Sequence, residues 1–261
     1  EVNHIDLIRY TNQVKNNGDY TDRTKRKHIG AIKTFFNWLV SMEIIPTGPS
    51  SKIKNVTCDE YIGRDKAMPE DDLKKLLKFL DRNPDYHIRH KALVLFLSDT
   101  GCRAGGAAGL QWSNVDFTTG TAIVTEKGNR TRPAWFFGLT TLALKDWREA
   151  QDRTQGDYVF SHRGGPIASP SLSQVFRRVC IKAGITSHGT HKMRHRKAHQ
   201  MIDNGESTTD AAIAIGDTVE TFIRHYAPKD FASAKEAAKR AATRAAQSKI
   251  VQMTGQNTGT E

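Results

Sequence analysis

The sequence predicts a mainly α-helical protein with one small antiparallel β-sheet, an α+β fold of two domains. Three observations point to this fold. Apolar residues recur at three- and four-residue spacing through most of the chain, which is the period of an amphipathic helix. The stretch 115–137 instead breaks into short apolar runs separated by turn residues, as hairpins do. A segment near 46–66 rich in proline, glycine and serine predicts a linker.

The basic charge excess predicts a polyanionic partner, with double-stranded DNA the leading candidate. The 261 residues hold 39 Lys and Arg against 28 Asp and Glu, a formal net charge of +11. Such an excess favours nucleic acid through counterion release and electrostatic steering. The sequence shows neither an apolar run of about 18 residues nor a signal-peptide pattern. We therefore expect a cytoplasmic, nucleoid-associated protein with no membrane partner.

Cysteine usage gives no sign of cross-links. Cys58, Cys102 and Cys180 are odd in number and far apart, which argues against a disulfide framework and against a Cys-x-x-Cys metal site. The chain is long enough to bury a core without such supports. The sequence therefore predicts no metal and no cofactor.

Residues 1–60 are predicted to form a small helical domain. An apolar pattern near the start predicts a short helix, and residues 24–42 predict a longer amphipathic one. Basic residues crowd the amino end of the longer helix, as expected of a surface that meets DNA phosphates. These candidate DNA contacts are Arg23, Lys25, Arg26, Lys27 and Lys33. The linker is expected to end at 61–66.

Residues 67–228 are predicted to form the larger domain. Pro69 and the acids after it mark a helix start, and an apolar run that stops at Gly101 predicts a helix buried in the core. After the hairpins we expect helices over 139–152 and 170–183, and helical structure up to 226. The tail 229–261 is expected to be helical to about 247 and then disordered.

The hairpin tip and one histidine-rich stretch are the candidate functional segments. The tip carries further candidate DNA contacts, Arg130 and Arg132. The stretch "THKMRHRKAHQMIDNG" places His191, His195 and His199 at four-residue spacing in a predicted helix. A zinc site of this spacing usually has a glutamate between its histidines, but here the intervening residues include cations, which oppose a metal ion. A basic helix surface and a phosphate-binding site both remain open from this stretch alone.

Four short motifs occur in a fixed order along the chain. "TGCR" contains Arg103, "KGNR" contains Lys127, "HKMRH" contains His191 and Arg194, and "RHY" contains Tyr226. In this order they resemble the tyrosine recombinase (phage integrase) family, which has TG-x-R, a lysine-bearing hairpin, H-x-L-R-H and a late tyrosine. Each motif alone is weak, and the four together make the resemblance specific.

The resemblance implies a fold and a mechanism. The fold is a tyrosine recombinase catalytic domain preceded by a small helical core-binding (SAM-like) domain, expected here to be truncated at its start. In the mechanism Tyr226 attacks the scissile phosphate while Arg103 and Arg194 stabilise its charge. His191 takes the phenol proton and Lys127 protonates the leaving oxygen. No metal or ATP is required.

The resemblance also implies a biological role. It is that of a site-specific recombinase or integrase of a phage or other mobile element, joining DNA strands through a 3'-phosphotyrosyl intermediate. The expected partners are double-stranded DNA, further copies of the chain in a tetramer on two DNA sites, and accessory DNA-bending or directionality proteins. Two alternatives are a type IB topoisomerase-like enzyme and a catalytically impaired recombinase-like protein that only binds DNA.

Two positions depart from the family pattern. Asp217 occupies a slot where the family usually has His or Trp against the scissile phosphate, and is a possible sixth site residue. Gly106 stands three residues after the first arginine, where the family often has an acid. A carboxylate at 217 could repel the phosphate, reorient Tyr226 or be compensated locally.

Overall fold

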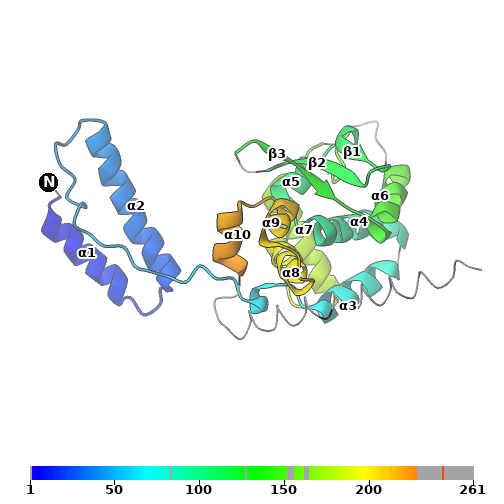
Figure 1. Ribbon diagram of the computed structural model, residues 1–261, viewed down its shortest axis with the longest axis horizontal. Coiled ribbons are helices and arrows are strands. Elements are labelled where there is room, and N and C mark those ends of the chain that lie inside the picture. The colour runs from blue at the N-terminus through cyan, green and yellow to red at the C-terminus, as the bar shows by residue number, and fades with distance from the viewer. Residues whose placement is uncertain are drawn as a thin grey trace, which may run out of the picture. The chain divides into compact units, whose positions relative to one another are not determined.

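The computed structural model describes residues 2–82, 84–126, 128–151, 156–161, 165–227 and 243, and Figure 1 shows its helices and strands. The chain divides into two compact units, Glu1–Glu60 and Tyr61–Glu261. Each unit has its own cluster of buried apolar residues. The predicted tail from 229 onward lies outside the described residues, except for residue 243.

The first unit is built on two helices, α1 (His4–Asn16) and α2 (Asp22–Ser41). α1 begins at Asn3, whose side-chain oxygen accepts the backbone N–H groups of Ile5 and Asp6, because the first N–H groups of a helix have no partner within it. α2 begins in the same way at Thr21. The two helices and the segment after them bury a small core: Leu7, Val14, Ile29, Phe36 and Ile53.

The second unit is mainly helical with a small sheet, which confirms the predicted fold class. Its α-helices are α3 (Glu70–Asp81), α4 (Pro84–Thr100), α5 (Ala104–Ala108), α6 (Leu139–Ala150), α7 (Ser169–Lys182), α8 (His191–Asp203), α9 (Thr208–Ile215) and α10 (Val219–Tyr226). Short 3-10 turns, η1 (Arg64–Lys66) and η2 (Trp112–Asn114), complete it. None of the helices in the described ranges is long and apolar enough to cross a membrane.

The sheet has three antiparallel strands in the order β1 (Val115–Asp116), β2 (Thr121–Glu126) and β3 (Arg130–Trp135). Side chains alternate along β2, so Ala122, Val124 and Glu126 face the interior. The register pairs Glu126 with Arg130, which leaves a tight loop between them. Lys127, the first residue of that loop, lies outside the described residues.

Helix α4 forms the centre of the second unit, where it packs against α3, α6, α7 and α8 (Figure 1). Its side chains are buried on most sides, and Phe96 and Leu97 are fully buried. This explains why its sequence is apolar nearly all round instead of on one stripe. The helix ends at Gly101, whose φ of 56° lies in the left-handed region that favours glycine.

Helices α8, α9 and α10 form a second buried cluster that contains Phe222 and Tyr226. α9 ends at Gly216, which has a φ of 72°. The N–H of Asp217 then bonds back to the carbonyl of Ala212 at 2.9 Å, the longer bond of a Schellman motif. After this turn the side chain of Asp217 is only 9% exposed.

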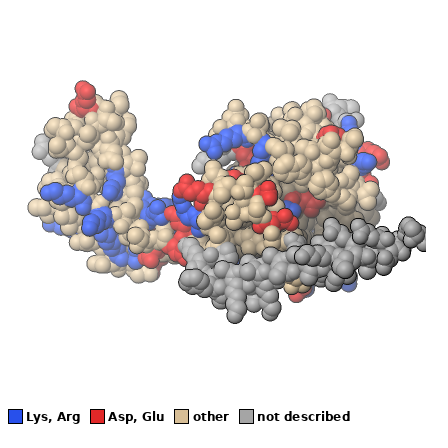
Figure 2. Space-filling view, viewed as in Figure 1, with Lys and Arg blue, Asp and Glu red and all other residues tan. Residues whose placement is uncertain are grey.

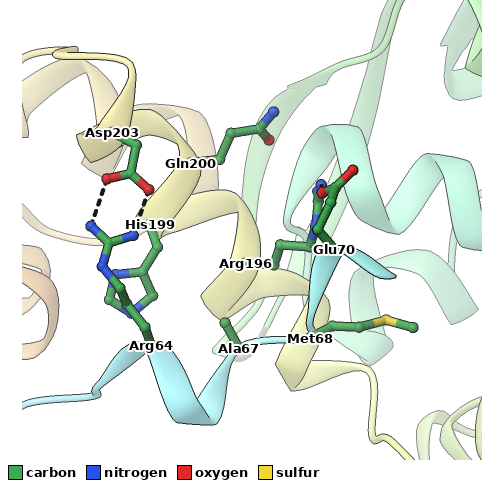
Figure 3. A pocket seen from close by; sticks show the side chains of 8 residues that line it. All are labelled: Arg64, Ala67, Met68, Glu70, Arg196, His199, Gln200 and Asp203. Atoms are coloured by element: carbon green, nitrogen blue, oxygen red, sulfur yellow. Dashed lines mark hydrogen bonds and ion pairs between the residues drawn. The ribbon is translucent and has the colours of Figure 1, made fainter. Parts of the chain in front are cut away.

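The end of the linker is attached to the second unit by main-chain and charged contacts. The Ile62 N–H donates to the His225 carbonyl at 2.7 Å, and Arg64 forms two hydrogen bonds of 2.5 Å with the Asp203 carboxylate. Figure 3 shows this ion pair beside a pocket lined by residues of the linker end, α3 and α8. The linker end therefore reaches the residue that precedes Tyr226.

The core of the first unit gives a direct test of its packing. Ile29 is fully buried, and Ile29→Ala should destabilise the unit by about 2–5 kcal/mol because it leaves a cavity among a small set of neighbours. Urea unfolding followed by circular dichroism would measure the loss. Ile44→Ala, which removes a side chain that is 60% exposed, is the matched control and should change stability by less than about 0.5 kcal/mol. Equal effects of the two would contradict this packing.

Candidate active site

Two arginines from distant parts of the chain converge on one carboxylate. Arg103 Nη2 lies 2.9 Å from Asp217 Oδ1, and Arg194 Nη2 lies 3.0 Å from Asp217 Oδ2. Each oxygen of the carboxylate therefore takes one guanidinium. Arg103 donates a hydrogen bond to this carboxylate, whereas Arg194 Nη2 lies within ion-pair distance of it without forming a hydrogen bond.

Arg103 is placed by the end of α4 and the start of α5. Gly101 turns the chain, and Arg103 follows as the extended residue directly before α5. Its guanidinium also donates to the Gly216 carbonyl at 3.3 Å. The side chain keeps 32% of its surface exposed, so it can reach a ligand from solution.

Arg194 is the buried member of the pair. It lies in the first turns of α8 with a side chain only 4% exposed. Its guanidinium donates to the Gly101 carbonyl at 3.0 Å and to the Ile215 carbonyl. These carbonyls belong to the carboxyl ends of α4 and α9, where helix carbonyls lack partners within the helix and carry partial negative charge. The burial of this cation is thus offset by two carbonyls and by the ion pair with Asp217, and its Nη2 atom has no hydrogen-bond partner among the described residues.

Glu126 is a second carboxylate at the site and is not among the candidate residues predicted from the sequence. Its side chain is 5% exposed, and it forms an ion pair with Arg103 Nη1. Oε1 also accepts the Arg103 backbone N–H at 2.9 Å. The signal was present in the sequence, since β2 alternates and an acid at an inward position needs a buried partner.

Tyr226 is the last residue of α10 and is 2% exposed. Its phenol oxygen lies 2.9 Å from His195 Nδ1, within hydrogen-bonding distance. Burial raises the pKa of Tyr226 to about 12, against the opposing effect of the nearby Arg194 and Arg103. Burial also lowers the pKa of His195 to about 4, helped by His191 and Arg194. The phenol is therefore paired with a neutral imidazole at pH 7.

The three histidines of α8 differ in what they contact. His191 is exposed, and its ring centre lies 6.4 Å from that of His195. His199 is buried, donates from Nε2 to the Ile62 carbonyl at 3.0 Å, and packs edge-on against the Tyr226 ring at 5.6 Å. The ring that bonds to the phenol is therefore that of His195, and the role predicted for His191 as acceptor of the phenol proton stays a prediction.

The two hairpin arginines, Arg130 and Arg132, differ in exposure. Arg130 is exposed, as a DNA contact requires. Arg132 is not: its side chain is 12% exposed, and it donates to the Ala214 carbonyl at 3.1 Å and lies 3.3 Å from Glu126 Oε1. Its contacts connect the hairpin to α9, and its expected DNA contact stays a prediction. Lys127 lies outside the described residues.

The candidate DNA contacts of the first unit all lie on α2. Figure 2 shows lysine and arginine side chains gathered on one face of this unit. Arg23, Arg26 and Lys27 are exposed, while Lys25 and Lys33 are half-buried. Arg26 is held by Glu60 at 2.6 Å and Lys33 by the Ile53 carbonyl at 2.6 Å. Lys25 also lies 4.0 Å from the Asp22 carboxylate.

The part of the chain that the structure describes holds no cluster of three His, Cys, Asp or Glu side chains arranged to bind a metal ion. The histidine stripe instead faces Tyr226 and the linker end. The geometry brings together two arginines, a phenol, an imidazole and two carboxylates. These are groups that can bind a phosphodiester and attack it with an oxygen nucleophile.

Residues 66–232 match the phage integrase family. The chain belongs to that family. It is an enzyme of the tyrosine recombinase class, site-specific recombinases that cleave and rejoin DNA. The match covers the arginines, the histidine stripe and Tyr226.

Similar proteins and similar solved structures support this assignment. The tyrosine recombinase XerC of Yersinia pestis is 25% identical over 207 residues, 78% of this chain and 67% of XerC. The integrase of transposon Tn1549 in complex with a circular intermediate DNA superposes with a TM-score of 0.71 at 16% identity, over 92% of this chain and 86% of that one. The XerH recombinase bound to palindromic difH gives a TM-score of 0.71 at 19% identity, over 91% and 72%. The recombinase fold is thus shared at low sequence identity.

The depressed pKa of His195 predicts how the stability of the recombinase depends on pH. An unfolded histidine titrates near 6.5, whereas folded His195 titrates at about 4. Between these values the unfolded chain binds more protons, so stability falls as pH drops through this window and is complete above it. His195 should contribute at least about 1 kcal/mol to the difference between pH 5 and pH 7.

Thermal unfolding across this range would measure the effect. His195→Asn, which keeps a polar partner for the phenol, should flatten the dependence on pH. An unchanged slope in this variant would show that His195 is not the titrating group.

Proposed function

We propose that this recombinase integrates or excises the DNA of a phage or other mobile element, through a 3'-phosphotyrosyl intermediate. The observation that carries the proposal is the convergence of Arg103, Arg194 and the Tyr226–His195 pair from α5, α8 and α10. Mobile-element origin is supported by the likeness to the Tn1549 transposon integrase, which was solved with a circular intermediate DNA.

The two arginines would bind the scissile phosphate. Asp217 presents its two oxygens to the two guanidiniums at 2.9 and 3.0 Å, and two non-bridging phosphate oxygens can make the same contacts. Planar, permanently charged donors fit this task. Removing either arginine should cost about 3 kcal/mol of transition-state stabilisation, on the order of a hundredfold in the rate of strand cleavage.

Tyr226 would attack the phosphorus, displacing the 5'-oxygen of the next nucleotide. The hydrogen bond supports His195 as the acceptor of the phenol proton, with His191 beside it at the open side of the site. Lys127 of the hairpin is proposed as the general acid that protonates the departing 5'-oxygen. Each proton transfer is typically worth about 10² to 10⁴ in rate.

The phosphotyrosyl bond would conserve the energy of the broken phosphodiester, so rejoining to another strand needs neither ATP nor a metal. The helical unit 1–60 is proposed to bind DNA through its exposed basic residues, together with the catalytic domain 67–228. Strand exchange between two sites would require a tetramer, and accessory DNA-bending or directionality proteins would set its outcome. The support for the assembly is the family resemblance.

Tyr226→Phe tests the nucleophile. A nicked suicide substrate carrying the recombination site should trap a covalent protein–DNA adduct with the wild type and none with Tyr226→Phe, since phenylalanine has no oxygen to attack with. Tyr158→Phe is the matched control, because Tyr158 takes part in a β-bridge with Gln111 outside the site, and it should form the adduct normally.

Adduct formation by Tyr226→Phe would overturn the assignment of the nucleophile. Relaxation of any supercoiled plasmid regardless of sequence would favour a type IB topoisomerase-like activity instead.

A second candidate function, DNA binding with little cleavage, is favoured by one observation. The Asp217 carboxylate occupies the donors of both arginines with a side chain only 9% exposed. A phosphate must displace it, and a negative charge beside the scissile group opposes the attack.

Asp217→His tests this restraint. The substitution removes the carboxylate and leaves a group that can bond to a phosphate, so the single-turnover cleavage rate should rise about tenfold or more. Asp210→His on α9 is the control, because Asp210 accepts a hydrogen bond from Ser207 at the helix start and, within the described residues, forms no ion pair with either arginine. A cleavage rate that stays equal or falls in Asp217→His would show that the carboxylate does not restrain the enzyme.

A further inference from the structure

Glu126 holds Arg103 at two points. One oxygen pairs with Arg103 Nη1, and the other accepts the Arg103 backbone N–H at 2.9 Å. The carboxylate thus fixes both the main chain and the guanidinium of the same residue. Arg103 Nη2 is left to the Asp217 side, where the phosphate is proposed to bind.

Gly106 leaves room for the Glu126 side chain to reach Arg103 from strand β2. A Cβ at position 106 would lie 3.3 Å from Glu126 Cγ, 3.6 Å from its Oε1 and 3.4 Å from Val124 Cβ. The Glu126 side chain therefore fills the space that a side chain at 106 would occupy. Position 106 is the one at which the family often has an acid.

We propose that Glu126 is the positioning residue of Arg103 and replaces, from strand β2, the acid missing at position 106. This inference rests on the proposed function, in which Arg103 binds the scissile phosphate. Arg103 is 32% exposed on a flexible side chain, and a two-point hold removes most of its freedom before DNA arrives. Prior orientation of this kind lowers the barrier of the chemical step.

Because the acid comes from Glu126 and not from position 106, it also connects Arg103 to the hairpin. An acid at 106 would lie on α5 next to Arg103 and would hold the arginine alone. Glu126 is the last residue of β2 and precedes Lys127 directly. Its carboxylate also lies 3.3 Å from Arg132 on β3. The same side chain therefore fixes Arg103 relative to both strands of the hairpin that carries the proposed general acid.

Charge balance supports the assignment. Burial lowers the pKa of Arg132, and the neighbouring Arg194 lowers it further, while Glu126 acts to raise it. Without Glu126, the mostly buried Arg132 guanidinium would keep the like charge of Arg194 nearby and lose the carboxylate that offsets it, which is unfavourable.

The test is a set of variants at positions 126 and 106, read by the single-turnover cleavage rate at saturating suicide substrate and by DNA affinity. Glu126→Ala should lower the cleavage rate by about tenfold to a hundredfold with little change in affinity, since a misplaced catalytic group typically costs about that much. Glu126→Gln keeps an acceptor for the Arg103 N–H and should fall between Glu126→Ala and the wild type.

The decisive variant moves the acid to the family position. Gly106→Asp in the Glu126→Ala background should recover at least about tenfold of the lost rate, because the space left by Glu126 admits the new carboxylate beside Arg103. Gly106→Asp alone should be slower than the wild type, since its Cβ crowds Glu126 at 3.3 Å. Gly105→Asp with Glu126→Ala is the matched control and should recover nothing, because position 105 is exposed and has no neighbour within 4 Å.

The same variants are also read by thermal unfolding without DNA, which separates this inference from the proposed function. Arg103→Ala should change the unfolding midpoint less in the Glu126→Ala background than in the wild type, and Gly106→Asp should restore the difference. A wild type that forms no adduct while this coupling is present would overturn the proposed function alone. Absence of the coupling, or equal recovery by Gly105→Asp and Gly106→Asp, would overturn the role of Glu126.

Discussion

The ion-pair network of Arg103, Arg132 and Arg194 with Glu126 and Asp217 is the interaction on which the second unit depends. Three like charges held close together within a folded domain repel one another strongly unless each is matched by acceptors. Glu126 lies between Arg103 and Arg132, and Asp217 lies between Arg103 and Arg194. The sheet, α5, α8 and α9 must all be in place before these pairs can form.

Helix ends supply the remaining acceptors. Arg194 donates to carbonyls of Gly101 and Ile215, and Arg132 donates to that of Ala214. These oxygens lie at the carboxyl ends of α4 and α9, where the helix dipoles favour cations. Both helices stop at a glycine in the left-handed region, at 56° for Gly101 and 72° for Gly216. A Cβ at Gly216 would also collide with the Arg132 side chain. The Arg132 guanidinium therefore packs directly against the glycine turn that ends α9.

Tyr226, the proposed nucleophile, is held mainly by apolar packing and not by ion pairs. Tyr226 sits in an apolar cluster with Phe222, which keeps its phenol neutral in the free protein. His195 is uncharged for the same reason, since burial penalises its protonated form. The linker end reaches this pair through Ile62, which bonds both to His199 and to the His225 carbonyl. The phenol is therefore held by contacts from α8, α10 and the linker end together.

The sequence by itself determined the fold class and the positions of the helices and hairpins, because helix and strand periods are local properties of the chain. It also selected Arg103, Arg194 and Tyr226 through the order of short motifs. Only the tertiary structure decided which groups these residues meet. Glu126 bonds across 23 residues to Arg103, His195 forms a hydrogen bond with the Tyr226 phenol, and the Arg132 side chain is only 12% exposed. Such pairings depend on how distant elements pack, and no local pattern records them.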